Sequence, residues 1–475
     1  MSEAATGAAR SPRAWLGLAA LLVLGLAVRL YYFSIKAGMH YPDEIFQYLE
    51  PAYWVRHGDA WLPWEYARGV RNWVLPAYYG SLMTLGEWLG YQGWELHRLL
   101  TLHNTLFGLL LIPAGLRLGR AASRGDERVA WLTGLFLAAF PLFGYFGPHT
   151  LSELHGLLLT TWAYALWMEQ VAAEDREGDR RKAFVVGLLL GGAFVTRYTL
   201  LVFVPVVALD YLLFSRKRQF VAATAGFLTM IALLAIVDWI TWGVPLHAFI
   251  EYVRYNLIED GASHHGVSPL DFYWQEAFVE RLGHARWLLV LPALAFARAH
   301  WRMLGGWLLP FVAFSVIRHK EERFLLSIWP FLLVGALVAW FALLDRLPRR
   351  RWSAGLATAL LLLVCGANFV GVSKMRMRWK AGIFQAQDFV GQQADATGLL
   401  LDDRLHLNGG YTLLNRSIPQ LQFHTGHLRN RLYNYVAVYE ERSLQQMRRW
   451  RGFEEVATFE DTTVFRRQQG LVPPP

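Results

Sequence analysis

Cysteine and charged residues are scarce in this sequence, and each scarcity excludes a class of protein. The 475 residues contain one cysteine, Cys365, so no disulfide can form within the chain. Charged residues make up 17% of the chain against about 25% in soluble proteins, which excludes disordered and coiled-coil classes. The sequence also lacks internal repeats, low-complexity segments and any motif for nucleic-acid binding.

Apolar and aromatic residues are abundant instead, and they predict a polytopic membrane protein. Hydrophobic residues reach 55%, tryptophans number 21, and the mean hydropathy is +0.25. A spanning helix needs about 20 largely apolar residues. Runs of about this length without Asp, Glu, Lys or Arg cover 99–116, 129–152, 220–237, 324–344 and 352–373. Shorter runs, which flanking Arg, Tyr and Trp extend, cover 14–28, 154–168, 183–196, 198–209, 287–297 and 303–317. Arg29 and Tyr31 follow the first run where a signal peptide has a small-residue cleavage site, so we expect an uncleaved span.

The distribution of positive charge predicts the orientation of these spans. The net charge of +9 comes from 46 Lys and Arg against 37 Asp and Glu. Under the positive-inside rule, the basic clusters belong on the cytoplasmic side, where they also meet anionic lipid headgroups. These clusters begin at Arg10, Arg117, Arg176, Arg216, Arg298 and Arg346. They share one side only if the apolar segment 73–90 does not cross, which gives about eleven spans, with the N-terminus inside and the C-terminus outside.

The same topology predicts two domains. Residues 1–373 form an all-α transmembrane domain whose outer loops are 34–97, 239–283 and 318–323. Residues 374–475 are polar and are expected to form a small extracytoplasmic α/β domain. Its expected strands are Gly398–Asp402, Tyr435–Tyr439 and Thr463–Phe465, and its expected helices are Phe384–Gln393 and Leu444–Trp450.

The first outer loop opens with a candidate catalytic segment, His40-Tyr41-Pro42-Asp43-Glu44. Proline followed by two acids is typical of a helix start, where the dipole favours carboxylates. The functional alternative is a general base or ligand pair, because a helix N-terminus at the membrane surface holds a carboxylate rigidly.

Aromatic residues and arginines alternate further along this loop, from Trp64 to Trp73. Such a pattern is typical of an interfacial anchor, and it is equally compatible with ligand contact. Glu65 and Arg68 stand three residues apart and can form a surface ion pair of little energetic weight.

The link Arg318-His319-Lys320-Glu321-Glu322-Arg323 is the strongest charge anomaly in the sequence. It lies between two apolar runs and is too short to be an independent loop, so its side chains must face headgroups or an internal cavity. A solvated turn is one interpretation. An anion site for a phosphate is the other, since Arg offers a bidentate fork and Lys a point charge. Arg197, between two apolar runs, is expected at the same surface.

Three of these segments resemble the signature segments of glycosyltransferase family 22, the GT-C-type mannosyltransferases that extend N-glycan precursors and GPI anchors. They are 40–50, 64–71 and 319–324. A weaker similarity covers Asp238, Trp242, Gly243, Pro245, Phe249, Tyr255 and Asn256. The resemblance extends over roughly residues 14–372. Family members commonly carry histidine directly before the proline, whereas this chain has Tyr41 there and His40 one position earlier.

The resemblance implies an inverting enzyme that moves mannose from a polyprenyl phosphate to a hydroxyl of a lipid-linked or glycan acceptor on the outer face. It implies Asp43 as general base, with Glu44 as a second carboxylate that orients the acceptor or substitutes for the base. His319, Lys320, Arg323, Arg197 and Arg71 are assigned to the donor phosphate. His40, Tyr41, Glu65, Arg68, Glu321 and Glu322 are assigned to substrate contacts.

We expect no cofactor. Asp43, Glu44 and His40 are acceptable ligands for a divalent metal, but adjacent carboxylates diverge on a helix and the nearby cations already supply positive charge. The expected partners are the polyprenyl-phosphate sugar, the acceptor and membrane lipids, without nucleic acid. The end of the sequence, Leu471 to Pro475, lacks a retention-like motif and favours a bacterial plasma membrane over the endoplasmic reticulum.

Three alternatives remain open at this point. A GT-C enzyme for another lipid-phosphate sugar would share the architecture, because fold is shared more widely than substrate. A polar-lipid transporter or flippase would carry polar residues at the membrane midplane, whereas those of this sequence gather at one surface. A structural or assembly subunit would use the outer tail to recruit partners.

Overall fold

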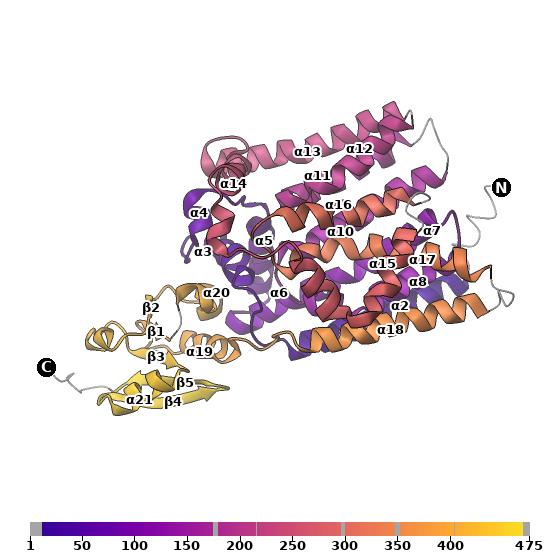
Figure 1. The fold of residues 1–475 in the computed structure, drawn as a ribbon. Helices are drawn as coiled ribbons and strands as arrows, with labels where there is room; N and C mark the ends of the chain where they lie inside the picture. The colour runs from indigo at the N-terminus through magenta and orange to yellow at the C-terminus, as the bar shows by residue number, and fades with distance from the viewer. Residues whose placement is uncertain are drawn as a thin grey trace. The chain divides into compact units, whose positions relative to one another are not determined.

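A computed structural model gives the fold of this chain (Figure 1). It describes residues 12–173, 179–214, 216–295, 300–346, 352–402 and 404–468. The basic positions Arg10, Arg176 and Arg298, the arginines at 349–351 of the cluster that begins at Arg346, and the terminal residues Leu471–Pro475 lie outside these ranges. The chain divides into two compact units. The first contains 1–33, 104–148 and 152–375, and the second contains 34–103, 149–151 and 376–475.

The first unit is helical. Its α-helices are α2 (Pro12–Ile35), α7 (Leu111–Ala122), α8 (Glu127–Ala139), α9 (Pro141–Phe146), α10 (Ser152–Ala172), α11 (Arg180–Thr196), α12 (Val204–Leu213), α13 (Lys217–Trp242), α14 (His247–Val253), α15 (Arg286–Ala295), α16 (Trp301–Val316), α17 (Trp329–Leu344) and α18 (Ser353–Ser373). Its short 3₁₀ and π turns are η2 (Gly108–Leu110), η3 (Tyr198–Phe203), η4 (Arg254–Ile258), η5 (Gly261–His265), η6 (Trp274–Glu280), η7 (Gly283–Ala285) and η8 (Glu322–Ile328). Helix α6 (Gly93–Phe107) runs from the second unit into the first.

Five stretches of helix within the described residues are long and apolar enough to cross a membrane. They are Pro12–Ile35, Gly93–Ala122, Lys217–Trp242, Glu322–Leu344 and Ser353–Ser373. Tyr198–Leu213 and Trp301–Val316 are shorter apolar helices. The predicted run 129–152 is not one helix, because Pro141 ends α8 and opens α9. The chain is therefore an integral membrane protein, while the count of about eleven spans and its orientation stay predictions.

A buried arginine satisfies the backbone at this proline break. Residue 141 would donate to the carbonyl of Leu137 in a continuous helix, but proline has no N–H. The guanidinium of Arg29 supplies the missing donor, at 3.1 Å from the Leu137 oxygen. It also donates to Gly108 O at 3.2 Å, where α6 gives way to the 3₁₀ turn η2. Arg29 thus closes two helix irregularities, as an apolar environment requires of exposed carbonyls.

Helices α11 and α13 lie side by side and approach closely at two glycines (Figure 1). A Cβ on Gly187 would stand 1.9 Å from the Ala223 carbonyl oxygen, and one on Gly226 would stand 2.1 Å from that of Phe184. No side chain fits at either position unless the helices separate. Small residues at such crossings let membrane helices make van der Waals contact along their backbones.

The second unit joins the first outer segment to the C-terminal tail. Its helices are α3 (Glu50–His57), α4 (Trp64–Arg68), α5 (Val74–Trp88), α19 (Ala381–Gly391), α20 (Gly410–Leu414) and α21 (Glu441–Arg449), with the turns η1 (Glu44–Leu49), η10 (Leu405–Leu407) and η11 (Thr425–Arg429). Its strands are β1 (Leu399–Leu401), β2 (Gln420–Gln422), β3 (Tyr435–Val438), β4 (Phe453–Phe459) and β5 (Thr462–Arg467).

The strands form one mixed sheet in the order β2-β1-β3-β5-β4. β1 is parallel to both β2 and β3, and β5 is antiparallel to both β3 and β4. One face packs Leu400, Val436 and Phe465 with Met447 of α21. The small C-terminal sheet predicted from the sequence is therefore confirmed. The predicted domain boundary at 373/374 lies close to the change of unit at 375/376.

Two sets of contacts within the second unit hold its distant segments together. The N–H groups of Ala37 and Met39 donate to the carbonyls of Met377 and Trp379, at 3.2 and 3.0 Å. The buried Glu50 carboxylate accepts from both the N–H and the hydroxyl of Thr412, each at 2.7 Å. The loop predicted at 34–97 therefore folds against the tail.

Gly226→Leu should destabilise the protein, because the new side chain pushes α13 away from α11. Overpacking of this kind costs about 1–3 kcal/mol, so the thermal midpoint in detergent should fall. Gly366→Leu in α18 is the matched control, since a Cβ there meets nothing within 4 Å. Equal midpoints for the two variants would contradict the close crossing.

Candidate active site

The segment that carries the two predicted acids turns into a helix at Glu44. Asp43 is the N-cap residue of the π-helical turn η1, and α3 continues from it at Glu50. π-helical turns occur frequently at functional sites. Asp43 is partly accessible, whereas Glu44 is buried. The two neighbouring carboxylates therefore have different environments, and only Asp43 is open to a ligand.

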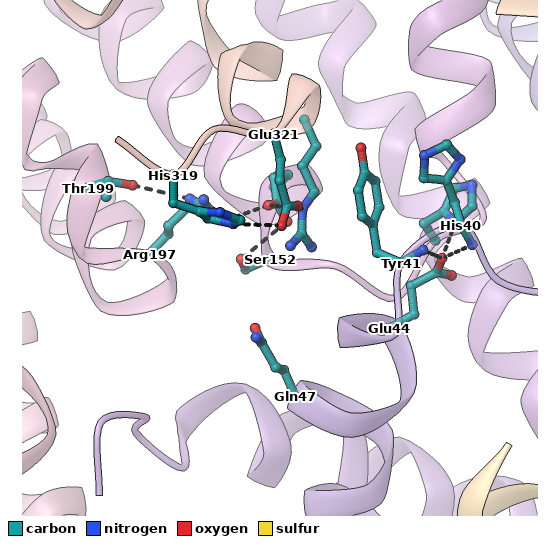
Figure 2. A network of polar contacts seen from close by, with 12 residues as sticks. His40, Tyr41, Glu44, Gln47, Ser152, Arg197, Thr199, His319 and Glu321 are labelled. Atoms are coloured by element: carbon teal, nitrogen blue, oxygen red, sulfur yellow. Dashed lines mark hydrogen bonds and ion pairs between the residues drawn. The ribbon is translucent and has the colours of Figure 1, made fainter. Parts of the chain in front are cut away.

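The Glu44 carboxylate is surrounded by donors from its own unit (Figure 2). Lys36 Nζ lies 3.0 Å from Oε2 and His149 Nδ1 lies 2.8 Å from Oε1. The backbone N–H groups of His40 and Tyr41 also donate to Oε1, at 2.8 and 3.2 Å. From the sequence, Glu44 was expected to orient the acceptor or to substitute for the base. Its contacts with these donors favour a different role.

Charge explains how Glu44 stays ionised at this depth. Burial alone would raise the pKa of this carboxyl, but the positive charges at His149 and Lys36 hold the pKa well below its usual range. The backbone hydrogen bond from His40 acts in the same direction. Glu44 is therefore an anion at neutral pH.

A second acid of the same unit, Glu65, has the opposite balance. It is buried on α4 and accepts from Gln47 Nε2 at 2.9 Å. Burial raises the pKa of Glu65, and the charge of Arg71 only partly opposes this. Arg68 is exposed at the end of α4. The hydrogen-bond partner of Glu65 is thus Gln47 of the turn η1. The spacing of Glu65 and Arg68 in the sequence does not indicate this partner.

In the first unit, the side chains of the charged link 318–323 point alternately to two sides. Glu321 has an extended backbone, with φ −136° and ψ 142°, and in extended chain successive side chains point to opposite sides. His319, Glu321 and Arg323 share one set of partners. Arg318, Lys320 and Glu322 have others.

The odd-numbered residues of the link meet Arg197 around two carboxylates (Figure 2). Arg323 pairs with Glu321 and lies 3.3 Å from Glu153 Oε1, and Arg197 pairs with the same Glu153. His319 Nε2 lies 3.1 Å from Glu321 Oε1. The expected meeting of Arg197 with the link is thus present, and three cationic groups converge within the first unit.

Arg197 is held in place by its own neighbours as well. It is the C-cap residue of α11, and its Nε donates to the Thr199 hydroxyl at 3.1 Å. Its guanidinium lies over the Phe324 ring, 4.1 Å from the centroid. Stacking and hydrogen bonding together fix the plane of the guanidinium.

The even-numbered residues of the link tie it to the rest of the unit. Arg318 pairs with Asp260 at 2.5 Å, and Lys320 Nζ donates to the Ser268 carbonyl at 2.8 Å. Glu322 accepts a bidentate pair from Arg281, at 2.6 and 2.7 Å. The structure therefore separates Lys320 and Glu322 from the cationic cluster formed by Arg197, His319 and Arg323.

The pKa values of His319 and Glu321 are shifted in opposite directions. The hydrogen bond to Glu321 raises the pKa of His319 against the effect of burial. Burial raises the pKa of Glu321, but Arg323 and His319 outweigh it and lower the pKa to about 2. His319 is therefore biased toward the imidazolium and Glu321 toward the carboxylate.

Three residues of these clusters were not found by sequence reasoning: Lys36, His149 and Glu153. His149 and Glu153 are the two ends of the stretch 149–153, where the predicted run 129–152 gives way to the run 154–168, and its polar residues were the available signal. Lys36 follows the first span directly, where a lysine is ordinarily read as an interfacial charge.

The donor set for a metal ion is limited. Within the described ranges, no three His, Cys, Asp or Glu side chains stand close enough together to hold one. His40 contributes its N–H to Glu44, and its ring lies 6.4 Å from that of His149 between centroids.

Solved structures define the class of the fold. The chain aligns with ArnT from Cupriavidus metallidurans bound to undecaprenyl phosphate, with a TM-score of 0.67 and 13% identity over 98% of this chain and 100% of that one. It also aligns with the Archaeoglobus fulgidus oligosaccharyltransferase, with a TM-score of 0.53 and 11% identity over 96% of this chain and 74% of that one. At these identities the likeness concerns the fold, which is that of GT-C membrane glycosyltransferases.

The family follows from sequence comparison. The model of the Alg9-like mannosyltransferase family matches residues 20–388, and the chain belongs to this family. The resemblance to glycosyltransferase family 22 is thereby confirmed, and with it the class of enzyme, a membrane mannosyltransferase.

Curated relatives agree with this assignment. GPI mannosyltransferase 3 of Yarrowia lipolytica is 25% identical over 387 residues, which cover 80% of this chain and 71% of the relative. GPI alpha-1,2-mannosyltransferase 3 of Bos taurus is 23% identical, over 66% of this chain and 57% of the relative. A Drosophila melanogaster relative, 24% identical over 58% of this chain and 41% of its own length, is named Dol-P-Man:Man(7)GlcNAc(2)-PP-Dol alpha-1,6-mannosyltransferase. This chain therefore matches less than two thirds of the length of several of these relatives.

Glu321→Gln should lower the pH at which His319 loses its proton. Glutamine keeps an acceptor oxygen but lacks the carboxylate charge, so the hydrogen bond and the charge attraction that raise the pKa of His319 both weaken, while burial and Arg323, which lower the pKa, remain. Diethyl pyrocarbonate reacts with neutral imidazole, so its rate of reaction at His319, followed peptide by peptide over about pH 5–8, reports the shift. The exposed His284 is the internal reference. An unchanged midpoint at His319 would contradict the proposed pairing.

Proposed function

We propose that this chain transfers an α-mannosyl residue from a β-linked polyprenyl-phosphate mannose to a hydroxyl of a lipid-linked glycan, with inversion and with Asp43 as general base. The observation that carries the proposal is the difference between the two acids of the first loop. Glu44 is occupied by Lys36 and His149, whereas Asp43 is partly accessible at the start of the same helix. A base must be reachable by the acceptor and rigidly held.

The proposed reaction is a single displacement. Asp43 takes the proton of the acceptor hydroxyl, and the oxygen attacks the anomeric carbon as the bond from that carbon to the phosphate oxygen breaks. The lipid phosphate leaves with the bonding electrons and needs no general acid, because a phosphate diester becomes a stable monoester anion. The enzyme must still stabilise the negative charge that develops on the leaving phosphate.

Arg197, Arg323 and His319 are proposed to supply that stabilisation. Glu153 and Glu321 hold the two guanidiniums, so they are oriented before the donor binds. Preorganised cations stabilise developing charge without reorganising during the reaction. Lys320 and Glu322 are proposed to act less directly, through the partners Ser268 and Arg281 that anchor the link.

The remaining sequence-based assignments are proposals of the same kind. Arg71 is proposed as a looser contact of the donor phosphate, and His40, Tyr41, Glu65 and Arg68 as contacts of sugar or acceptor. Asp43 and the outer segments are proposed to face the non-cytoplasmic side, on the distribution of basic residues. The GPI and dolichol-linked acceptors in the names of the relatives support a glycolipid acceptor.

Asp43→Asn should abolish transfer while the protein still folds, since loss of a general base costs about 10²–10⁴ in rate. The assay uses purified protein in detergent, polyprenyl-phosphate mannose and a panel of mannoside acceptors, with and without EDTA. Near-normal turnover by Asp43→Asn would reject this residue as the base. Binding of the donor without product from the wild type, across the whole panel, would indicate another lipid-phosphate sugar or another acceptor.

Arg323→Lys should raise the apparent KM for the donor by about tenfold or more, because lysine keeps the charge but loses the fork that contacts two groups at once. Arg318→Ala is the matched control, from the same link but paired with the exposed Asp260. The measurement is the donor dependence of the initial rate at saturating acceptor. An unchanged donor KM in Arg323→Lys would remove this residue from the phosphate site.

A further inference from the structure

The Lys36, Glu44 and His149 side chains form a buried ionic cluster that the proposed chemistry does not use. Their exposed fractions are 2%, 1% and 1%. Substrate cannot reach them, so these ionisable groups must serve something other than direct contact. Burying three ionisable groups is expensive, and it is offset only by close pairing and complete hydrogen bonding.

Hydrogen bonds connect the cluster to the backbone on both sides of Asp43. Glu44 Oε1 accepts from the N–H groups of His40 and Tyr41, which precede Asp43. The carbonyl of Glu44, which follows Asp43, accepts from the Thr150 hydroxyl at 3.0 Å, next to His149. The turn 40–44 is therefore closed by its own carboxylate, and its exit is bonded to the segment that carries the histidine.

Lys36 is fixed independently of the turn. Its carbonyl accepts from Arg98 Nη1 at 2.7 Å. The following residues, Ala37 and Met39, donate to Met377 and Trp379 in the tail. The ammonium that pairs with Glu44 thus stands on a backbone held by two other segments of the same unit.

We propose that Lys36 and His149, acting through Glu44, are positioning residues that set the place of the Asp43 carboxylate. The inference rests on the proposed function, in which Asp43 takes the acceptor proton. The Glu44 carboxylate fixes the turn, and Lys36 and His149 fix Glu44. Neither of these two side chains contacts the substrate.

A positioning role makes a distinctive kinetic prediction. Displacing a base by about 1 Å can cost about 100-fold in rate. The loss should fall on kcat, and the donor KM should hold within about twofold, because the cationic cluster of Arg197, His319 and Arg323 is untouched. A merely structural contact would lower thermal stability without this division.

The experiment compares His149→Leu with His149→Asn and Lys36→Met with Lys36→Arg, at a temperature well below every unfolding midpoint. Asparagine carries a donor where Nδ1 stands, and arginine keeps the charge, so both are expected to retain most of kcat. His149→Leu and Lys36→Met are expected to lose about 100-fold. His57→Leu is the matched control, because His57 pairs with Glu87 at 2.7 Å in the same unit but lies outside the turn.

A double variant tests whether the effect passes through Glu44. If His149 acts on the turn through this carboxylate, Glu44→Gln combined with His149→Leu should be no slower than His149→Leu alone. Multiplied losses would overturn the coupling. If His149→Leu does not fold, the same cycle is run with Lys36→Met.

The outcomes separate this inference from the proposed function. Wild-type kcat in both His149→Leu and Lys36→Met, with Asp43→Asn inactive, overturns the positioning role and leaves the base in place. Near-normal turnover in Asp43→Asn rejects the base, and with it the reason for positioning. A raised donor KM with unchanged kcat in the cluster variants also overturns the inference, since it would assign these groups to binding.

Discussion

A buried charge must find its partners inside the protein, and this constraint shapes both candidate clusters. Glu44 is buried, and its stability as an anion depends on Lys36, His149 and two backbone N–H groups. Glu153 is buried and is shared by Arg197 and Arg323. Removing one member of such a set leaves an uncompensated charge, which costs far more than the contact itself contributed. The polar groups at each site are therefore mutually fixed before any ligand arrives.

Much of the architecture was predictable, because apolar runs and alternating strands leave local patterns. β1, β3 and β5 fall within or around the predicted strands, whereas α19 and α21 overlap the predicted helices but begin and end earlier in the chain. β2 was not predictable, since Gln420–Gln422 contains a single apolar residue. β4 was hidden by an irregularity between Glu455 and Ala457, which breaks the alternation of its side chains. Pro141 indicates a helix break within the run 129–152. The absence of charged residues alone predicts one continuous span there, and this prediction is wrong.

The candidate site was partly predictable for a related reason. Asp43 and the charged link stood out because they place polar residues beside apolar runs, and Arg197 was expected near the link on topology. The side chains of the link 318–323 alternate because the backbone is extended at Glu321. Six adjacent polar residues in a sequence do not reveal that conformation. The partners Lys36 and His149 lie 8 and 105 positions from Glu44 along the chain (44 − 36 and 149 − 44). Contacts of that kind are set by tertiary packing, which leaves no periodic signal.

The contact of Glu50 with Thr412 has a consequence for how the protein is made. The two residues are 362 positions apart, and Ala37 and Met39 likewise find their partners only at Met377 and Trp379. During synthesis the first loop therefore emerges long before the segment that completes its fold. Until then the Glu50 carboxylate has its nearby partner, the Trp61 N–H at 3.1 Å, but lacks the two donors of Thr412. A chain that ended after α18 would lack the tail residues with which Ala37, Met39 and Glu50 form these hydrogen bonds.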